Sequence, residues 1–307
     1  MSDLSPKSLP AGYRSRSATT ADVHAVHCLV TACENELHGR ASTGSDRIAA
    51  DLSLPGLELR SDTVLVRDSE GELAGWSWVK GRRATVHVHP GHRGQGLGSS
   101  LLAWTEARAR QLGSDRIAQT VSDSDHPATA LLRSSGYSRL VTEWLLEIAM
   151  PVEPEVPETP AAITVRAFRA GDEQAAYQLT EDAFDEWQQR RKTYAEWARH
   201  TVEQATFEPA ASPVAFAGGQ MVGAVLSLDV PGGDEGYVER VAVRRDHRNR
   251  GIARMLLREA FRTFYRQGKQ TCTLWTHSDT GALSLYERIG MTVQRSSTVY
   301  GKALTTG

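Results

Sequence analysis

The sequence contains little cysteine and no long hydrophobic stretch. Its three cysteines, Cys28, Cys33 and Cys272, are an odd number without the spacing of metal ligands. This favours a reducing compartment over a disulfide framework, so we expect a cytoplasmic protein. No run of about 18 apolar residues occurs, and the polar segment 1–17 lacks the apolar stretch of a signal peptide. Neither a membrane span nor export is predicted.

Net charge is also almost absent. A formal charge of -2 gives no overall attraction to nucleic acid or to an anionic membrane, so any basic site must be local. Apolar residues make up 40% of the chain and charged residues 23%, which is typical of globular proteins. The 307 residues are enough for two domains of about 150 residues, each with its own core.

A segment rich in proline and glutamate lies at the middle of the chain. Residues 151–162 read PVEPEVPETPAA, a composition that favours an extended linker. On its two sides, landmarks recur about 155 residues apart: RGQGLG at 93–98 corresponds to RNRGIA at 248–253. We therefore expect two copies of one domain, at residues 1–150 and 163–307, joined by this linker.

Both copies show the same order of predicted elements. A short strand precedes one or two helices, then a hairpin at 62–81 or 212–230, then a fourth strand and a long helix. A strand, a helix and a last strand complete each copy. This order indicates the α/β (α+β) class, with two tandem three-layer domains, each a mixed, mostly antiparallel sheet flanked by helices.

The fourth strand of each copy runs into a glycine-rich turn that opens the long helix. Such a turn gathers backbone N–H groups and the positive end of a helix, which suits a phosphate or pyrophosphate. Gly96 and Gly98, or Gly251 and Ala253, are small enough to admit that ligand. A P-loop is excluded because Leu97 follows Gly96, and neither copy has a complete G-x-G-x-x-G fingerprint. A turn that only redirects the chain is the alternative.

The pattern Arg/Gln-x-x-Gly-x-Gly/Ala after a strand, with a downstream helix and a glycine turn, resembles the GNAT superfamily of acyl-CoA-dependent N-acyltransferases, in its tandem two-domain form. The resemblance covers both halves of the chain. In that family the turn holds the pyrophosphate of CoA, and the preceding strand bonds the pantetheine arm. It implies acetyl-CoA or another acyl-CoA as cofactor. The implied binding positions are Val86, Val88, Arg93, Gly94, Gly96, Gly98 and Ser99 in the first copy, and Val241, Val243, Arg248, Arg250, Gly251, Ala253 and Arg254 in the second.

Acylation of an amine needs a base for the ammonium proton and an acid for the leaving thiolate. Tyr286 matches the family's general-acid tyrosine, and Glu239 stands where the family often keeps a base acting through water. We expect the backbone N–H near Val241 to polarise the thioester carbonyl, as a one-donor oxyanion site. The first copy has Leu132 in place of Tyr286 and Ala84 in place of Glu239. We therefore expect catalysis in the second copy, and acyl-CoA binding without catalysis in the first.

Other interpretations of these residues stay open. Tyr286 also fits a half-buried packing residue. Glu239 also fits a solvated strand residue, and His277 and Asp279 are rival proton carriers. Where the family usually has asparagine, the chain has Asp125 and Asp279, which leaves that CoA contact undecided.

Metal and nucleic-acid sites are weighed and not expected. His87, His89 and His92 have no Cys, His or carboxylate partner at ligand spacing, so we predict no metal. The segment 240–254 holds six arginines, which suit the phosphates of CoA as well as those of nucleic acid. Because no aromatic platform is interleaved with them, we expect no nucleic-acid partner.

The predicted function is N-acetyl transfer from acetyl-CoA to a primary amine of a small molecule, by direct attack. A non-catalytic acyl-CoA-binding or sensing protein, and an enzyme that uses a longer acyl-CoA, are the alternatives. Aromatic residues of the segment 184–197 (Phe184, Trp187, Tyr194 and Trp197) fall where the family shapes its acceptor pocket, and they suit a core equally. We expect no membrane partner, and a monomer or homodimer.

Overall fold

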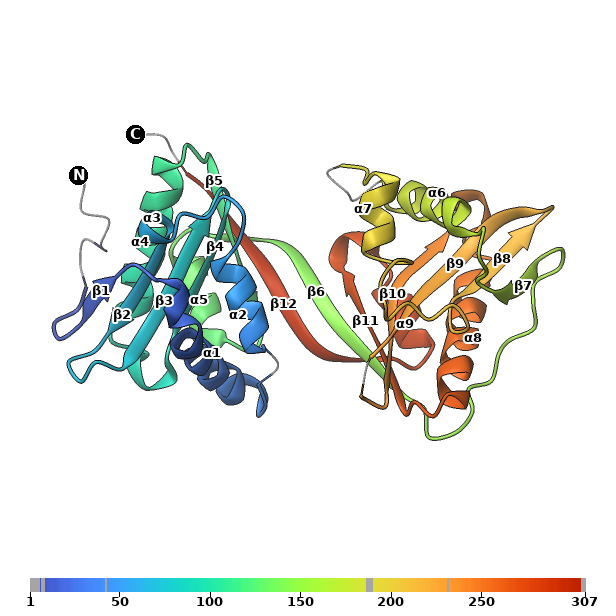
Figure 1. The fold of residues 1–307 in the computed structure, drawn as a ribbon, viewed down its shortest axis with the longest axis horizontal. Helices are drawn as coiled ribbons and strands as arrows, with labels where there is room; N and C mark the ends of the chain where they lie inside the picture. Colours follow the sequence, from blue (N-terminus) through green and yellow to red (C-terminus); the bar gives the residue numbers. More distant parts are fainter. Residues whose placement is uncertain (1–5, 7–8, 42, 186–189, 231, 305–307) are drawn as a thin grey trace. The chain divides into compact units, whose positions relative to one another are not determined.

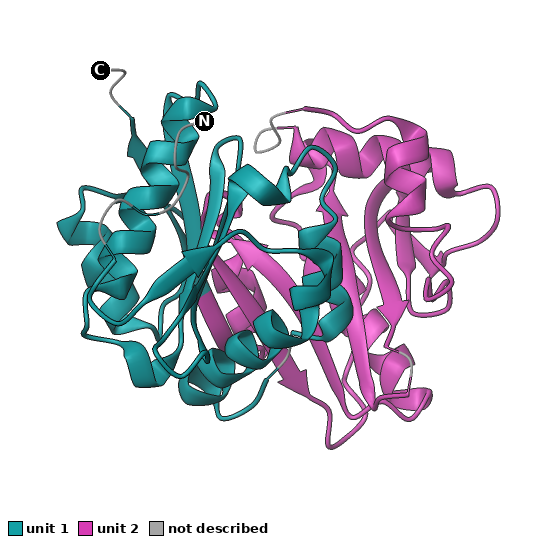
Figure 2. Cartoon of the chain, turned by 60° about the vertical axis from the view of Figure 1, so that its left-hand side comes forward, with its two compact units in different colours: residues 1–142, 297–307 teal, residues 143–296 magenta. Residues whose placement is uncertain are grey.

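The chain forms two compact units. The computed structural model describes residues 6, 9–41, 43–185, 190–230 and 232–304. Unit 1 comprises residues 1–142 and 297–307, and unit 2 comprises residues 143–296 (Figure 2). The sequence predicts a division at 151–162, whereas the structure divides the chain within two long strands.

Each unit contains a mixed, mostly antiparallel sheet, as the sequence predicts. In sheet order, unit 1 has β1 (Arg14–Arg16), β2 (Thr63–Arg67), β3 (Leu73–Lys80), β4 (Arg83–Val88), β5 (Arg116–Ser122) and the later part of β12 (Thr292–Ala303). Unit 2 has β7 (Thr164–Ala167), β8 (Pro213–Ala217), β9 (Gln220–Asp229), β10 (Glu235–Val243), β11 (Thr271–His277) and the later part of β6 (Ser138–Ala149). In the described part of the chain, β4–β5 and β10–β11 pair in parallel, and the other pairs of known register are antiparallel.

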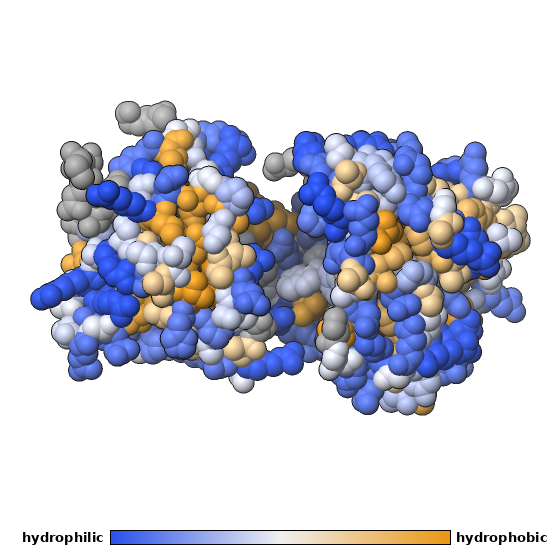
Figure 3. Space-filling model, viewed as in Figure 1, coloured by the Kyte–Doolittle hydropathy of each residue, from blue (hydrophilic) through white to orange (hydrophobic). Residues whose placement is uncertain are grey.

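Helices cover both faces of each sheet, which confirms the predicted three layers (Figure 1). Unit 1 has α1 (Val23–His38), α2 (Ser45–Leu52), α3 (Leu59–Asp62), α4 (Leu97–Gln111) and α5 (His126–Ser134). Unit 2 has α6 (Glu173–Phe184), α7 (Tyr194–Arg199), α8 (Ile252–Arg266) and α9 (Leu283–Arg288). On the face drawn in Figure 3, hydrophobic residues gather toward the middle of each unit and hydrophilic residues surround them.

The long helix of each unit packs closely on its sheet. Apolar residues at three-to-four spacing give α4 and α8 one buried side, which includes Leu101 and Leu256. A glycine lies beneath each helix: a Cβ on Gly75 would be 2.9 Å from Leu101, and a Cβ on Gly223 would be 3.0 Å from Leu256. The close approach brings the start of each helix to the end of the fourth strand of its unit.

The last strand of each unit comes from the other half of the sequence. Residues 297–303 of β12 pair with residues 116–122 of β5, and Tyr300 is buried in the core of unit 1. Residues 143–149 of β6 pair with residues 271–277 of β11, and Leu146 is buried in the core of unit 2. Because the two copies share one pattern, the sequence gives no sign of which copy each last strand completes.

The segment 151–162 has no helix or strand, but it belongs to unit 2. Pro154 is buried, and Val156 packs against the core that α8 covers. Glu153 forms an ion pair of 2.6 Å with Arg266 of α8. The segment is therefore a packed connection within one unit rather than a spacer between two domains.

Candidate active site

A cavity of about 670 Å³ lies in unit 2, where β10 and β11 separate. The two strands pair in parallel from Glu235 and Thr271 as far as Val238 and Leu274, and the ladder ends there. Beyond this point β10 continues to Val243, paired with β9 alone. Its backbone groups on the β11 side therefore face the opening, where an extended ligand arm can bond them.

The glycine-rich turn after β10 forms one wall of this cavity. Gly251 has a φ of 79° and forms the N-cap of α8, with no side chain capping the helix. Asn249 also adopts a left-handed conformation, with a φ of 62°. The first N–H groups of α8 are thus available for an anion, in line with the helix dipole. The residues present fit the pyrophosphate of an acyl-CoA.

Glu239 lies at a β-bulge in β10. The register against β9 shifts between Val238 and Arg240, so Glu239 is the extra residue, and its side chain lines the cavity. Burial raises the pKa of this carboxyl, and the positive charges of Arg240 and Lys192 oppose the rise. A carboxylate with a raised pKa is a stronger base than an exposed one.

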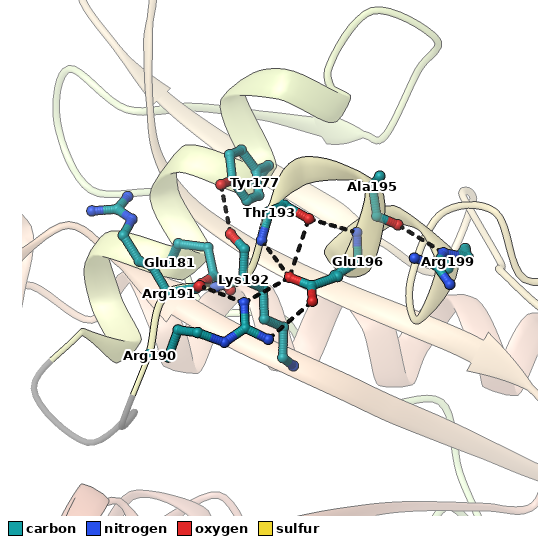
Figure 4. A network of polar contacts seen from close by, with 9 residues as sticks. All are labelled: Tyr177, Glu181, Arg190, Arg191, Lys192, Thr193, Ala195, Glu196 and Arg199. Carbon is teal, nitrogen blue, oxygen red and sulfur yellow. Dashed lines mark hydrogen bonds and ion pairs between the residues drawn. The ribbon is translucent and has the colours of Figure 1, made fainter. Parts of the chain in front are cut away.

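Polar contacts hold the loop before α7, which carries Lys192 (Figure 4). The positive charge of Lys192 acts on Glu239. The Lys192 backbone N–H donates to Glu181 at 2.7 Å, and its carbonyl accepts from the Tyr177 hydroxyl at 2.7 Å. Arg190 donates two hydrogen bonds of 2.9 Å to Glu196. Burial and the nearby charge of Arg240 lower the pKa of Lys192.

Tyr286 lines the same cavity from α9. Its side chain is 7% exposed, and burial raises the pKa of its hydroxyl to about 12. The hydroxyl therefore keeps its proton at neutral pH and can donate it. The packing interpretation also holds in part, because the ring belongs to the core of unit 2. Tyr286 thus packs with its ring and reaches the cavity wall.

Unit 1 has a second cavity, of about 590 Å³, at the corresponding place. Gly94 and Gly96 have φ values of 75° and 83°, and Gly96 forms the uncapped N-cap of α4. All seven binding positions expected in the first copy line this cavity: Val86, Val88, Arg93, Gly94, Gly96, Gly98 and Ser99. In unit 2, the cavity lining includes Val241, Val243, Arg248, Gly251, Ala253 and Arg254. Arg250 is exposed and is not among the lining residues.

The residues of unit 1 at the acid and base positions differ from those of unit 2. Leu132 of unit 1 lies at the position that Tyr286 has in unit 2. The Leu132 carbonyl accepts a hydrogen bond from the N–H of Tyr137, which follows the glycine turn. The Tyr286 carbonyl accepts the equivalent bond from the N–H of Met291. The sequence pairs Ala84 with Glu239, but the structure differs: Ala84 lies opposite Val79 in a ladder without a bulge. Unit 1 lacks the inserted residue altogether.

The arginines that open the two turns bond to protein atoms. Arg93 pairs with Glu36 at 2.6 Å and with Asp125 at 3.4 Å. Arg248 donates to the carbonyls of Val243 and Ala183, at 3.2 and 3.5 Å. Both side chains thus tie the turn to the rest of its unit, a role that the sequence does not predict.

The charges of the two cavities differ. Among the described residues, four arginines and one carboxylate line the unit 2 cavity: Arg240, Arg248, Arg254, Arg288 and Glu239. One arginine and two carboxylates line the unit 1 cavity: Arg93, Glu34 and Asp125. The unit 2 cavity is therefore the more favourable one for a polyanion such as CoA.

Other residues considered from the sequence lie as follows. His87 lines the unit 1 cavity, and burial lowers the pKa of its ring. His92 bonds to the Tyr13 hydroxyl at 2.8 Å. In the described ranges, no group of three or more His, Cys, Asp or Glu side chains could hold a metal ion. His277 lines the unit 2 cavity, whereas Asp279 is exposed and is not among its lining residues.

The early aromatic residues of unit 2 divide between core and cavity. Phe184 lines the cavity, and the Arg240 guanidinium lies 5.6 Å from the centre of its ring. Trp197 is fully buried in the core, and Tyr194 contacts its ring. Trp187 lies outside the described residues.

Sequence reasoning missed Trp275, which lines the unit 2 cavity and is 46% exposed. The available signal is the alternation of TCTLWTH, which puts Trp275 and the core residue Leu274 on opposite faces of β11.

Comparisons with known proteins agree with this geometry. The model of the acetyltransferase (GNAT) family matches residues 26–137 and 174–291, one match in each half of the chain. The chain belongs to the acetyltransferase (GNAT) family. This GNAT protein is 30% identical over 276 residues to the mycothiol acetyltransferase of Geodermatophilus obscurus, covering 82% of the chain and 88% of that relative. A mycothiol acetyltransferase of a Nocardioides species is 28% identical, with 88% of the chain and 96% of the relative covered.

Solved structures give the same result. The crystal structure of a GCN5-related N-acetyltransferase from Sphaerobacter thermophilus matches with a TM-score of 0.80 and 30% identity, over 98% of each chain. A tandem GNAT protein from the clavulanic acid biosynthesis pathway matches with a TM-score of 0.69 and 16% identity, over 96% of this chain and 99% of the other, which shows the shared fold. The chain is therefore an acyltransferase with two GNAT-like repeats. Among its described residues, no helix is both long and apolar enough to span a bilayer.

Proposed function

We propose that the chain transfers an acetyl group from acetyl-CoA to a primary amine of a small molecule, at the unit 2 cavity. The observation that carries this proposal is that one cavity joins the Gly251 turn, the separated strands, Glu239 and Tyr286. The name of the relatives, mycothiol acetyltransferase, supports acetyl as the group transferred.

The uncapped start of α8 would hold the pyrophosphate, and the open edge of β10 would bond the pantetheine arm. Positioning the thioester beside the amine makes the reaction effectively unimolecular. The backbone N–H near Val241 would stabilise negative charge on the thioester oxygen.

Glu239 would accept a proton from the ammonium group, directly or through water. The amine nitrogen then forms a bond to the thioester carbon, and the carbon–sulfur bond breaks. Tyr286 would give its proton to the leaving thiolate, which yields free CoA, and the nitrogen would lose its second proton as the amide forms. That proton restores the Tyr286 hydroxyl, and Glu239 releases the first proton to water. No covalent bond to the protein forms.

Unit 1, in this proposal, holds an acyl-CoA without transferring its acyl group. Its cavity has the turn with Gly94 and Gly96, which supports binding. It has Leu132 in place of the acid and no inserted residue in place of the base. The free thiols of Cys28, Cys33 and Cys272 support a location in the cytoplasm.

The test is release of free CoA from acetyl-CoA with a panel of primary amines. Tyr286→Phe should lower kcat by about 10²-fold or more, the usual contribution of a general acid. Tyr137→Phe, a matched loss of a hydroxyl in unit 1, should leave kcat unchanged. Absence of turnover with every amine would contradict the proposal, as would full activity of Tyr286→Phe. Tight acetyl-CoA binding without turnover would point to a sensing protein instead.

A further inference from the structure

We infer that Trp275 is a platform on which the amine acceptor stacks, and that the acceptor carries a ring close to its amine. This inference rests on the proposed function, because it concerns the acceptor side of the same cavity.

Trp275 and Glu239 occupy neighbouring positions where the strands separate. Val238 and Leu274 form the last parallel pair, and both side chains pack in the core that α8 covers. Since successive side chains of a strand point to opposite faces, Trp275 points away from α8. Glu239 follows Val238 directly, and its charge interacts with Lys192 of the loop before α7, on that other face. Glu239 and Trp275 thus each follow the last paired residue of their strand, and both line the same cavity.

The exposure of Trp275 contrasts with that of its neighbours. Its side chain is 46% exposed, whereas Leu274 is 1% exposed and Thr276 is 7% exposed. A single exposed apolar residue is ordinary on a protein surface. This one, however, lies in the wall of the cavity that holds the proposed base. A rigid, flat indole at that place offers a face for a ring and loses little conformational entropy on binding.

The residues of β6 that pair with this part of β11 lie beside the cavity and are not among its lining residues. Leu145 of β6 lies opposite Trp275, and Glu143 lies opposite His277. Paired residues of adjacent strands share a face, so an apolar floor made by Trp275 and Leu145 is followed by two polar side chains. A ring that rests on the floor would present its amine to Glu239 at one edge and meet polar groups at another.

Among the described residues of unit 1, the corresponding position of β5 holds no aromatic side chain. Ile117 packs in the core with α4, and Gln119 donates a hydrogen bond of 3.3 Å to Thr105 of α4, so both side chains of β5 face that helix. Successive side chains of a strand alternate between faces, so Thr120 points away from α4. Thr120 therefore stands where unit 2 has Trp275. An acceptor platform in unit 2 alone agrees with catalysis in unit 2 alone.

The experiment compares amines of equal carbon number with and without a ring. Cyclohexylmethylamine is paired with n-heptylamine, and glucosamine with the open-chain 2-amino-2-deoxyglucitol; benzylamine represents aromatic rings. Stacking on an aromatic side chain contributes roughly a three- to tenfold preference, so we expect kcat/KM to favour the ring member of at least one pair by that factor. The amine pair with the larger ratio of kcat/KM values shows whether the acceptor carries a sugar ring or an apolar or aromatic ring.

Three variants tie this preference to the indole. Trp275→Ala should abolish the ring preference by lowering kcat/KM for the ring amines alone, with an unchanged KM for acetyl-CoA. Trp275→Phe should retain most of the preference. Leu112→Ala, which removes an exposed apolar side chain from unit 1, should have no effect.

Two results would overturn the inference while leaving the proposed function intact. One is equal kcat/KM for ring and open-chain amines in the unaltered protein. The other is an equal loss for all amines in Trp275→Ala, which would show a merely structural residue. If no amine is acetylated, the proposed function itself fails, and the inference fails with it.

Discussion

Replacing Tyr300 by alanine tests whether the last strand of unit 1 comes from the C-terminal half of the sequence. Tyr300 lies in β12, yet its side chain is 1% exposed within the core of unit 1. Arg133 of α5 also donates a hydrogen bond of 3.5 Å to its hydroxyl. Removal of a fully buried aromatic side chain costs about 3–5 kcal/mol, and we expect unit 1 to lose this stability.

Leu146→Ala is the mirror experiment. Leu146 lies in β6, in the N-terminal half of the sequence, but its side chain is fully buried in the core of unit 2. Leucine-to-alanine changes in cores cost about 2–5 kcal/mol. The two variants should therefore lose a similar amount of stability, Tyr300→Ala in unit 1 and Leu146→Ala in unit 2.

Hydrogen–deuterium exchange of the intact protein, read by mass spectrometry, provides the assay. A loss of about 3 kcal/mol corresponds to roughly a hundredfold faster exchange of amides that open with the whole unit. Tyr300→Ala should accelerate exchange in β3 and leave β9 protected, and Leu146→Ala should do the reverse. If Tyr300→Ala instead accelerates β9 and spares β3, the assignment of the strands is wrong.

Three further predictions follow from individual residues. Glu239→Gln should lower kcat by about 10²-fold. It should also remove the ascending limb of the pH–rate profile, because the activity of the unaltered protein should rise with pH through the raised pKa of Glu239. An unchanged ascending limb would assign the base to another residue. Gly236→Ala should cost unit 2 about 1–3 kcal/mol in chemical denaturation, since the new Cβ would lie 2.6 Å from the Phe264 ring. The Arg166 guanidinium lowers the pKa of Asp172, so the folded protein binds this proton less tightly than the unfolded chain. Stability should therefore be full above the ordinary carboxyl pKa of 3.8 and should fall as acid lowers the pH through the folded pKa, and Asp172→Asn should weaken that dependence in acid unfolding curves.

The sequence predicts those features of the site that depend on neighbouring residues along the chain. A strand, a small turn residue such as Gly251 and a helix follow one another directly, so the anion cradle is encoded locally. The repeat then doubles the evidence, because Gly96 recurs in the same context. The sequence also predicts that Glu239 and Tyr286 belong to one site, because Glu239 lies on the strand before the turn and Tyr286 on a later helix of the repeat. Both residues line the same cavity.

Features that depend on distant contacts could not be predicted in this way. The two copies have equivalent patterns, so nothing local tells which sheet Tyr300 enters. The bulge at Glu239 is a mismatch with β9 and leaves the spacing of the sequence unchanged, so the sequence alone pairs Ala84 with Glu239. Arg248 looks like a phosphate ligand in a basic run, but it donates to the nearby carbonyl of Val243 and to the carbonyl of Ala183, which only the fold brings near.

The turnover of a matched pair of glycine variants tests the central claim most directly. Gly251 and Gly96 both adopt left-handed conformations at the N-caps of their helices, with φ values of 79° and 83°. A valine at either position is strained and fills the cradle with a branched side chain. Acetyl-CoA-dependent acetylation should be lost in Gly251→Val and retained in Gly96→Val. Loss in Gly96→Val with full activity in Gly251→Val would contradict the assignment of catalysis to unit 2.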